Sequence, residues 1–496
     1  MQEQTVNLRE YLQNGLRPEL LMPKNSRVLS VCTNAMPSDR GLLSPTRIQT
    51  PFASDPFDDW PWPQILRGGF WTLLGGKTTL QIVTEGTTWN RATANLYQLE
   101  TPGSAFTLTA GGVWHFADFG KTWVASNGVS LLTLDTRYSD VGGADKVLGT
   151  TAVPIKALCA FNGRALYGGF SASFAWPTAW STMLTTYLSG SSYVYSTLDF
   201  GENFVCWTAI GKQHLPLHDP PSDLIGMIRQ GQFGFAPMPW KGTVYALKQL
   251  GNDVIAYGST GIARLTPHGV NFGIQKLASF GIASRGAVGG DEDEHIFIND
   301  EGALWRLSGQ GLQRLGFEEL LFPMVGQEIA ISLDPARREY YICGEGSTSA
   351  QKSFILSPQG LGGGYHQVTS CVRSAGFLYG VYAAAASAEV AFTTEVLDFG
   401  SRDFKTLTGV EIEHSTSSTV AVAISTRNTA NGSWTTSTYR NCDANGYVRV
   451  QKTAVDFRIH VTVASHSSLQ MSNLRARVQF VGRRFRRGVD ADSTDA

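Results

Sequence analysis

The sequence predicts an all-β fold. Two features of its composition point this way: it contains 53 glycines, and aromatic residues make up 11% of the chain. From about Trp60 to Tyr382, short runs rich in Val, Ile, Tyr, Trp and Phe alternate with Gly, Asn and Asp. Such runs are typical of short strands that tight turns connect.

The strand pattern is clearest in two stretches of the chain. In the first, a Gly-Asn-Asp turn and a Gly-Ser-Thr-Gly turn separate three predicted strands, Val244–Leu247, Val254–Tyr257 and Ile262–Leu265. In the second, four predicted strands follow one another: Ala287–Val288, His295–Ile298, Ala303–Leu307 and Leu312–Leu315. Successive strands with such short turns form an antiparallel meander.

This unit recurs at a spacing of roughly 40 to 50 residues, with about four strands in each repeat. Repeats of that size are typical of β-propeller blades, because each small sheet covers its faces only by packing on its neighbours. We therefore expect a β-propeller of about six or seven blades. A pair of Greek-key sandwiches is the structural alternative.

Residues 118–123, Asp-Phe-Gly-Lys-Thr-Trp, resemble the Asp-box turn of sialidase-like propellers, although Phe116 stands where that motif begins with Ser. The motif is a turn between strands and implies no chemistry.

The chain divides into four predicted parts. Residues 1–55 are an N-terminal arm or platform segment, with a short helix that Gly15 and Pro18 end. Residues 56–385 form the propeller and residues 386–482 a smaller, sandwich-like C-terminal β domain, with turns at Asn431-Gly432 and Asn445-Gly446. Residues 483–496 are a charged tail.

Charge and cysteine content exclude several classes of protein. The net charge is -1, so overall charge does not favour nucleic acid or a membrane as a partner. The six cysteines are scattered singly, so we expect reduced, mostly buried thiols. The chain lacks a signal-peptide pattern and any run near the ~20 apolar residues that span a bilayer, so we expect it to fold in a cytoplasm.

Several motifs that suggest chemistry have simpler explanations. Asp-Phe-Gly occurs at 118–120, 199–201 and 398–400 without the other kinase motifs, so we interpret it as a turn. Residues 74–79, Leu-Gly-Gly-Lys-Thr-Thr, lack the first glycine of a phosphate-binding loop and predict a hairpin. His214 and His218 flank a proline and lack the helical spacing of a zinc site.

Catalytic residues are not expected. A glycosidase needs two carboxylates across a pocket, and Asp58, Asp59 and Asp219 are candidates that nothing in the sequence brings together. We predict that the protein is not an enzyme and needs no cofactor or metal.

Two charged clusters are candidate functional residues. An acidic run could form a solvated turn or line a central passage: Asp291, Glu292, Asp293 and Glu294. A basic group near the C-terminus could contact phosphates or fasten the chain to an acidic neighbour, and we favour the protein interface: Arg475, Arg477, Arg483, Arg484, Arg486 and Arg487.

Taken in order, phrases along the chain resemble the nozzle, or tail-hub, proteins of tailed bacteriophages. The phrases include NAMPSDRGLLSP, FNGRALYGGF, WPTAWST, VYALKQLGNDVIAYGSTGIARL, GIASRGAVGGDEDEHIFINDEGALWRLSGQGLQRLGFEELL, SFILSPQGLGGGYHQVTS and VLDFGSRDFKTLTGVEIE. Together they cover most of the chain. The resemblance lies in many short phrases, and no single motif is diagnostic.

The resemblance implies a structural virion protein made in the host cytoplasm. Each subunit would contain a β-propeller with a platform around it, and the subunits would form a ring, usually a hexamer. The ring would extend the DNA exit channel below the portal and adaptor rings, conduct and retain DNA without sequence specificity, and mount fibre or tail-tip proteins. Acidic residues facing the channel would repel the DNA backbone.

Two other functions remain open. One is a propeller-based carbohydrate-active enzyme or glycan-binding tail protein. The other is a cellular propeller scaffold that binds a peptide partner.

Overall fold

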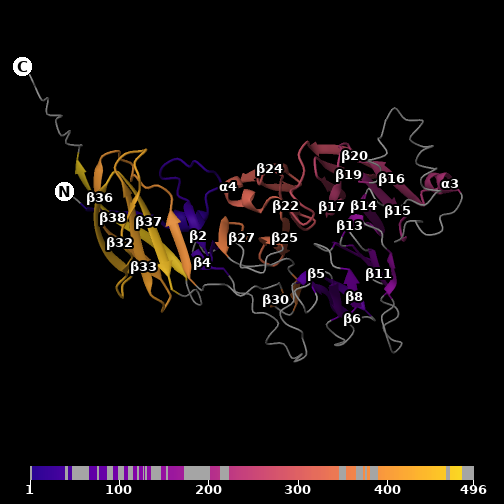
Figure 1. The fold of residues 1–496 in the computed structure, drawn as a ribbon, viewed down its shortest axis with the longest axis horizontal. Helices are drawn as coiled ribbons and strands as arrows, with labels where there is room; N and C mark the ends of the chain where they lie inside the picture. The colour runs from indigo at the N-terminus through magenta and orange to yellow at the C-terminus, as the bar shows by residue number, and fades with distance from the viewer. Residues whose placement is uncertain are drawn as a thin grey trace, which may run out of the picture. The chain divides into compact units, whose positions relative to one another are not determined.

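A computed structural model describes residues 3–38 and 43–46 and, between residues 66 and 151, the strands and a few turn residues. In the rest of the chain it describes residues 155–171, 202–212, 223–345, 353–364, 372–374, 377–379, 389–464 and 470–482. The chain splits into two compact units. Unit 1 comprises residues 1–47, 354–365 and 385–496, and unit 2 comprises residues 48–353 and 366–384. Both units consist mainly of antiparallel strands, so the predicted all-β fold is confirmed (Figure 1).

Unit 2 contains five four-stranded sheets among its described residues, and each sheet is built from four consecutive strands. The first two are β5 (Leu66–Leu74), β6 (Lys77–Glu85), β7 (Thr93–Gln98) and β8 (Phe106–Thr109), then β9 (His115–Asp118), β10 (Thr122–Ser126), β11 (Leu131–Asp135) and β12 (Val147–Thr151). The third is β13 (Ile155–Phe161), β14 (Arg164–Phe170), β15 (Phe204–Thr208) and β16 (Phe233–Pro237). The last two are β17 (Val244–Leu250), β18 (Asp253–Gly258), β19 (Ile262–His268) and β20 (Asn271–Ala278), then β21 (Val288–Gly290), β22 (Glu294–Ile298), β23 (Leu304–Ser308) and β24 (Gly311–Gly316).

Two antiparallel hairpins complete the described strands of unit 2. They are β25 (Glu328–Asp334) with β26 (Glu339–Glu345), and β29 (Val372–Ser374) with β30 (Phe377–Tyr379). The helices described in this unit are short: α3 (Leu224–Arg229), α4 (Glu318–Leu321) and a 3-10 turn at Phe322–Met324.

The predicted meanders are confirmed. The three predicted strands of the first stretch lie within β17, β18 and β19, and the four of the second stretch match β21 to β24 to within a residue or two. Leu74 pairs with Lys77 across β5 and β6, so the glycine-lysine motif lies in the predicted hairpin. The Asp-box sequence also lies between paired strands, with Asp118 opposite Trp123.

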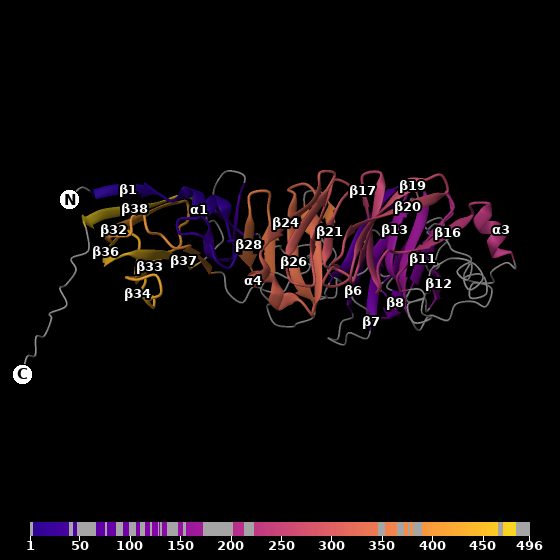
Figure 2. The same cartoon turned by 90° about the horizontal axis from the view of Figure 1, so that it is seen from above.

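Neighbouring sheets of unit 2 pack through their apolar faces. One buried cluster joins the β13–β16 sheet to the β17–β20 sheet and includes Ala157, Val205, Val244 and Leu247. The approach is close because a Cβ atom at Gly169 would lie 2.1 Å from the Val244 carbonyl oxygen, so only glycine fits there. A second cluster joins β17–β19 to β21–β23. In Figure 2 these sheets lie side by side within unit 2.

The described residues of unit 1 form two sheets. The first has the order β27-β28-β3-β4-β38-β32-β36, with β1 also paired to β38. Its strands are β1 (Glu3–Asn7), β3 (Ala35–Pro37), β4 (Leu43–Pro45), β27 (Ser353–Leu356), β28 (Leu361–Gly364), β32 (Phe404–His414), β36 (Tyr447–Ala454) and β38 (Met471–Gly482).

The second sheet of unit 1 has the order β2-β31-β37-β33, and both β34 and β35 pair with β33. Its strands are β2 (Leu29–Thr33), β31 (Val390–Thr394), β33 (Val420–Arg427), β34 (Thr435–Thr436), β35 (Arg440–Asn441) and β37 (Asp456–Val463). β33 contacts β36 of the first sheet, and alternate residues of β37 and β38, such as Val461 and Val478, are fully buried. The alternation that predicted these C-terminal strands therefore reflects one buried face in each.

The N-terminal segment forms part of the same unit as the C-terminal strands. β1 pairs with β38 and β2 pairs with β31, which places indigo strands beside yellow and orange ones in Figure 1. The predicted helix is α1 (Arg9–Asn14), and it ends at Gly15 with a φ of 67°. It is shorter than the sequence suggested, because Val6 and Asn7 belong to β1.

Two further expectations concern cysteines and membranes. Five cysteines lie among the described residues, all are free, and four are buried: Cys32, Cys159, Cys206 and Cys343. Within the described part of the chain, no helix has the length and apolar character needed to cross a membrane.

Candidate functional site

The predicted acidic run, residues 291–294, forms the turn between β21 and β22 and is clasped by one arginine. Arg338, from the turn between β25 and β26, pairs with Asp291, and its guanidinium nitrogens lie 4.0 Å from Asp293 and 3.3 Å from Glu294. Glu294 also lies 3.3 Å from Arg306 and accepts a 3.0 Å hydrogen bond from the Tyr340 hydroxyl. Cationic side chains of the same unit therefore offset much of the negative charge of this turn.

The Asp291 carboxylate is stabilised in its charged form. Burial alone would raise its pKa, but the backbone amides of Asp293 and Glu294 donate to it and Arg338 pairs with it, so its pKa falls below the ordinary value. The side chain of Asp293 is 87% exposed and Glu292 is also exposed. Within the turn, these two residues are the acidic groups that solvent reaches best, and the channel-lining role stays a prediction.

Replacing Arg338 should loosen this turn. We expect Arg338→Gln to destabilise unit 2 by about 1 kcal/mol, because Asp291 and Glu294 would then face each other without the shared cation. Hydrogen exchange of peptides from the β21–β22 turn should accelerate. Arg314→Gln is the control: it removes one ion pair, between the exposed Arg314 on β24 and Glu318 on α4, and should change exchange much less. Equal effects of the two variants would contradict the clasp.

The predicted basic group is only partly described. Arg475 and Arg477 lie on β38, whereas Arg483, Arg484, Arg486 and Arg487 lie outside the described residues. Arg475 lies 3.1 Å from Glu411 and 2.7 Å from Glu413 on β32, and Arg477 lies 3.5 Å from Glu411 and stacks 4.8 Å from the Tyr447 ring centroid. These two arginines pair with carboxylates of their own sheet, so they are poorly placed to bind phosphate.

A cationic cluster that the sequence did not predict lies where strands of successive sheets approach one another in unit 2. His115 is on β9, Lys156 on β13 and Lys248 on β17, and Arg285 lies in the segment before β21. Arg285 donates to the carbonyl oxygens of Lys156 and, at 2.7 Å, of Ser126 at the end of β10. One side chain therefore ties together segments of three sheets.

Burial and like charges lower pKa values in this cluster. Burial lowers the pKa of Arg285 to about 9. Burial first, and then the charges of Arg285 and Lys248, lower the pKa of His115 well below its ordinary value. Lys248 has no hydrogen-bond or ion-pair partner among the described residues, and burial lowers its pKa too. Such a cluster can attract an anion, but nothing in it is arranged to transfer a proton to a substrate.

Another histidine, close enough to Lys248 to feel its charge, is fully buried, and both of its ring nitrogens are hydrogen-bonded. His295 on β22 lies 2.8 Å from the Tyr257 hydroxyl through Nδ1 and 2.8 Å from the Gln249 carbonyl oxygen through Nε2. Since the carbonyl only accepts, Nε2 carries the proton and Nδ1 accepts from Tyr257. Burial, and then the charge of Lys248, lower the pKa of His295 to about 3.

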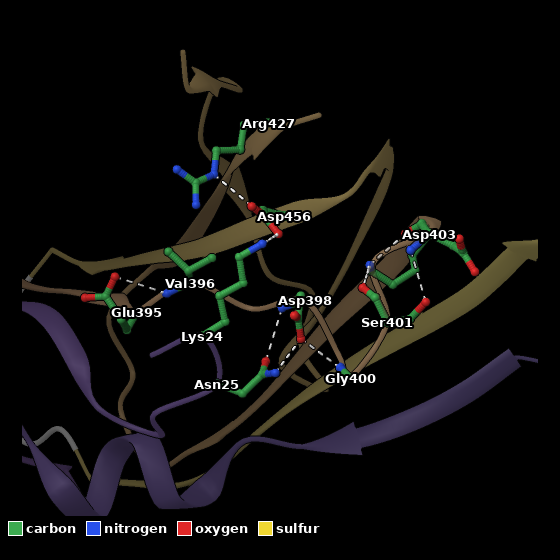
Figure 3. A network of polar contacts seen from close by, with 11 residues as sticks. Lys24, Asn25, Glu395, Val396, Asp398, Gly400, Ser401, Asp403, Arg427 and Asp456 are labelled. Atoms are coloured by element: carbon green, nitrogen blue, oxygen red, sulfur yellow. Dashed lines mark hydrogen bonds and ion pairs between the residues drawn. The ribbon is translucent and has the colours of Figure 1, made fainter. Parts of the chain in front are cut away.

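Unit 1 contains a polar network that fastens the N-terminal segment to the C-terminal strands (Figure 3). Lys24 lies 2.7 Å from Asp456, whose other oxygen accepts from Arg427 at 2.8 Å, and Asp456 is fully buried. Asn25 exchanges hydrogen bonds with Asp398. We call the contacts of residues 17–25 with Glu395, Asp398 and Asp456 the N-terminal clamp.

The same network has a third ion pair. Arg17 lies 3.2 Å and Arg458 3.0 Å from Glu395, whose side chain is only 4% exposed. Arg427 and Arg458 also lie 4.6 and 4.7 Å from the centroid of the Trp434 ring. The buried carboxylates are therefore each shared by two cations, which is how proteins offset the desolvation of a buried charge.

Lys405 is a buried cation beside this network, and backbone carbonyls hold it. Its ammonium donates to Ser401 at 2.6 Å and to Asp403 at 2.8 Å, within the loop that follows the Asp-Phe-Gly at 398–400. Asp398 accepts from the Gly400 amide at 2.8 Å, so this Asp-Phe-Gly is a turn, as predicted. The motif at 199–201 lies outside the described residues.

One serine and histidine pair invites comparison with a hydrolase. Ser425 lies 2.6 Å from Nε2 of His460, and Thr393 lies 2.9 Å from Nδ1. The third partner is a hydroxyl rather than the carboxylate that stabilises an imidazolium, and Ser425 is only 3% exposed. Burial and Arg458 lower the pKa of His460. The arrangement supports a structural role within the sheet.

The structure does not test the other sequence candidates. Asp58, Asp59, His214, His218 and Asp219 lie outside the described residues. Among the residues that the structure does describe, no group of three or more His, Cys, Asp or Glu side chains is placed to hold a metal ion.

Comparisons with known proteins give little further guidance. No family model matches the chain, and no curated protein matches it either. Among solved structures, the chain is similar to PorZ, described as an essential bacterial surface component of the type-IX secretion system of Porphyromonas gingivalis. The TM-score is 0.31 at 9% identity, and the match covers 66% of this chain but only 35% of that one. A likeness this slight supports no conclusion about function.

Proposed function

We propose that this protein is a structural component of a phage tail: a ring-forming nozzle or hub that extends the DNA exit channel below portal and adaptor rings. The observation that carries the proposal is the division of the chain. A unit of successive four-stranded sheets is inserted into a two-sheet unit that both ends of the chain build together. The sequence resemblance implies a propeller with a platform around it, and this division of the chain is compatible with that.

The β-propeller is part of the same proposal. In unit 2 the first strands of neighbouring sheets contact in series, β5 with β9, β9 with β13 and β13 with β17, and β21 contacts β25. The last hairpin returns to the start, because β29 contacts β5. Five four-stranded sheets and two further hairpins fit about seven blades.

The chemistry of the described residues favours a mechanical role over catalysis. The charged clusters pair mainly within the chain, as in the Arg338 clasp, the β38 arginines and the N-terminal clamp. Such pairs hold segments in fixed positions, which suits a rigid ring through which DNA passes.

Assembly assays test this function. Mass photometry and negative-stain images of the purified chain, mixed with portal and adaptor rings, should show ring-dependent docking and stacked rings. The same chain, incubated with host polysaccharide, should neither cleave nor bind it. A monomer that ignores both rings and cleaves or binds polysaccharide would instead be a carbohydrate-active or glycan-binding tail protein. Docking of a peptide on one face of unit 2 would indicate a cellular scaffold.

A further inference from the structure

Unit 1 displays two leucines on a loop that is held at both ends. Leu20 is 58% exposed and Leu21 is 85% exposed, the highest value among the large hydrophobic residues that the structure describes as exposed. Scattered exposed leucines are ordinary, but two adjacent ones at the tip of a loop form a small apolar knob. We call Leu20 and Leu21 the apolar knob.

The N-terminal clamp fixes the base of this knob. On one side, the Leu16 amide donates to Leu361 at 2.8 Å and Arg17 pairs with the nearly buried Glu395. On the other side, Lys24 pairs with the buried Asp456, and the Asn25 amide donates to Val396 at 2.9 Å. A loop with both ends anchored cannot easily fold its tip back onto the protein. The knob is therefore preorganised, which lowers the entropic cost of binding.

A second exposed surface of unit 1 combines an aromatic ring with basic side chains. Tyr439 is 51% exposed and precedes Arg440, which is exposed and donates to the Arg449 carbonyl at 3.2 Å. We call Tyr439, Arg440 and Arg449 the aromatic–basic patch. Glu389 lies close enough to contribute, after burial, to raising the Tyr439 pKa, so the patch carries one acidic neighbour.

The composition of the knob fits this patch. Exposed Glu19 precedes the two leucines, so an acidic group lies beside the apolar knob. The patch combines an exposed aromatic ring with two arginines, the residue types that dominate the binding energy of protein interfaces. Opposite charge and matching apolar surface favour contact between them.

We propose that the apolar knob of one copy docks on the aromatic–basic patch of a second copy of this chain. Because knob and patch are different surfaces, the contact is heterologous and joins copies head to tail, which closes into a ring when the rotation between copies permits. The inference deepens the proposed ring and rests on it.

Self-association measured by sedimentation velocity and mass photometry tests the contact. Wild-type protein should associate as its concentration rises, and Leu21→Ser should weaken this association at least tenfold while leaving the melting temperature unchanged. Tyr439→Ala should weaken it similarly. Ile210→Ser is the matched control: Ile210 is 69% exposed in unit 2, and its replacement should leave association as in the wild type.

Mixing the two variants distinguishes a heterologous contact from other arrangements. Leu21→Ser retains an intact patch and Tyr439→Ala retains an intact knob, so a one-to-one mixture should form dimers that neither variant forms alone. A wild-type chain that stays monomeric at the highest attainable concentration would overturn the proposal, as would variants that associate normally. Loss of adaptor docking with unchanged self-association would assign the knob to another partner. Adaptor docking that Leu21→Ser retains would leave the proposed function standing.

Discussion

Replacing Asp456 with Asn should destabilise unit 1 by about 3 kcal/mol, because Lys24 and Arg427 would lose the carboxylate they share. Removing one partner of a buried ion pair is costly because the remaining charges stay desolvated. Arg427 is only 17% exposed, but Lys24 is 34% exposed and can regain water. We therefore expect an effect at the lower end of the range for buried pairs.

Hydrogen exchange resolved to peptides is the suitable measurement, because the chain has two units and a single unfolding transition cannot be assumed. Peptides covering β33 and β37 should exchange faster in Asp456→Asn, and those from unit 2 should not change. Glu10→Gln is the control, since it removes an ion pair to Arg27 in the same segment in which both side chains are more than half exposed. It should cost well under 1 kcal/mol. Equal costs for the two variants would contradict the role of burial.

A second variant separates the contributions of Lys24 and Arg427 to stability. Lys24→Met leaves Arg427 paired with Asp456, so no buried charge remains alone and the loss should be smaller than for Asp456→Asn. Because Lys24 belongs to the N-terminal segment, its loss should increase exchange at β2 as well. If Lys24→Met were the more damaging change, the carboxylate would not be the centre of the network.

The repeated strands of unit 2 could be predicted because their signals are local. The glycine and asparagine turns between Val244 and Leu265 fix where each strand ends, and alternation fixes which face is buried. The missed member of that sheet, β20 (Asn271–Ala278), is the outermost strand of the meander, and most of its residues are exposed or half-buried. Its sequence therefore lacks the apolar pattern that marks a buried strand.

The contacts that position the candidate sites could not be predicted, because they join residues far apart in the chain. Lys24 and Asp456 have ordinary neighbours in sequence, and their segments meet because β2 pairs with β31 and β31 pairs with β37. Likewise, nothing beside Arg338 marks it as the partner of Asp291, although the acidic run itself was evident. Arg285, between small residues in Ala-Ser-Arg-Gly-Ala, offers one usable signal: a lone charge in an apolar stretch is often buried and bonded.

Lowering the pH from 7 to 4.5 should destabilise unit 2 by about 2 to 3 kcal/mol through His295 alone. Burial holds the pKa of this imidazole at about 3 in the folded chain, against an ordinary value of about 6.5. Between these values the unfolded state binds the proton and the folded state does not, so stability falls as the pH falls below 6.5. The loss is complete below about pH 3. Protonation would also force Nδ1 to donate toward Tyr257, whose hydroxyl would have to reverse its hydrogen bond.

The test compares the pH dependence of unfolding in wild type and His295→Gln. The variant should be less stable at pH 7, because it cannot keep both hydrogen bonds of the buried ring, yet its stability should decline less steeply toward pH 4.5. His115 and His460 also have lowered pKa values and contribute to the wild-type slope, so the difference between the two proteins isolates His295. The exposed His268 provides the control, and His268→Gln should keep the wild-type slope. If His295→Gln kept that slope too, the buried imidazole would have to accept its proton without breaking the contacts with Tyr257 and Gln249, contrary to the geometry of this site.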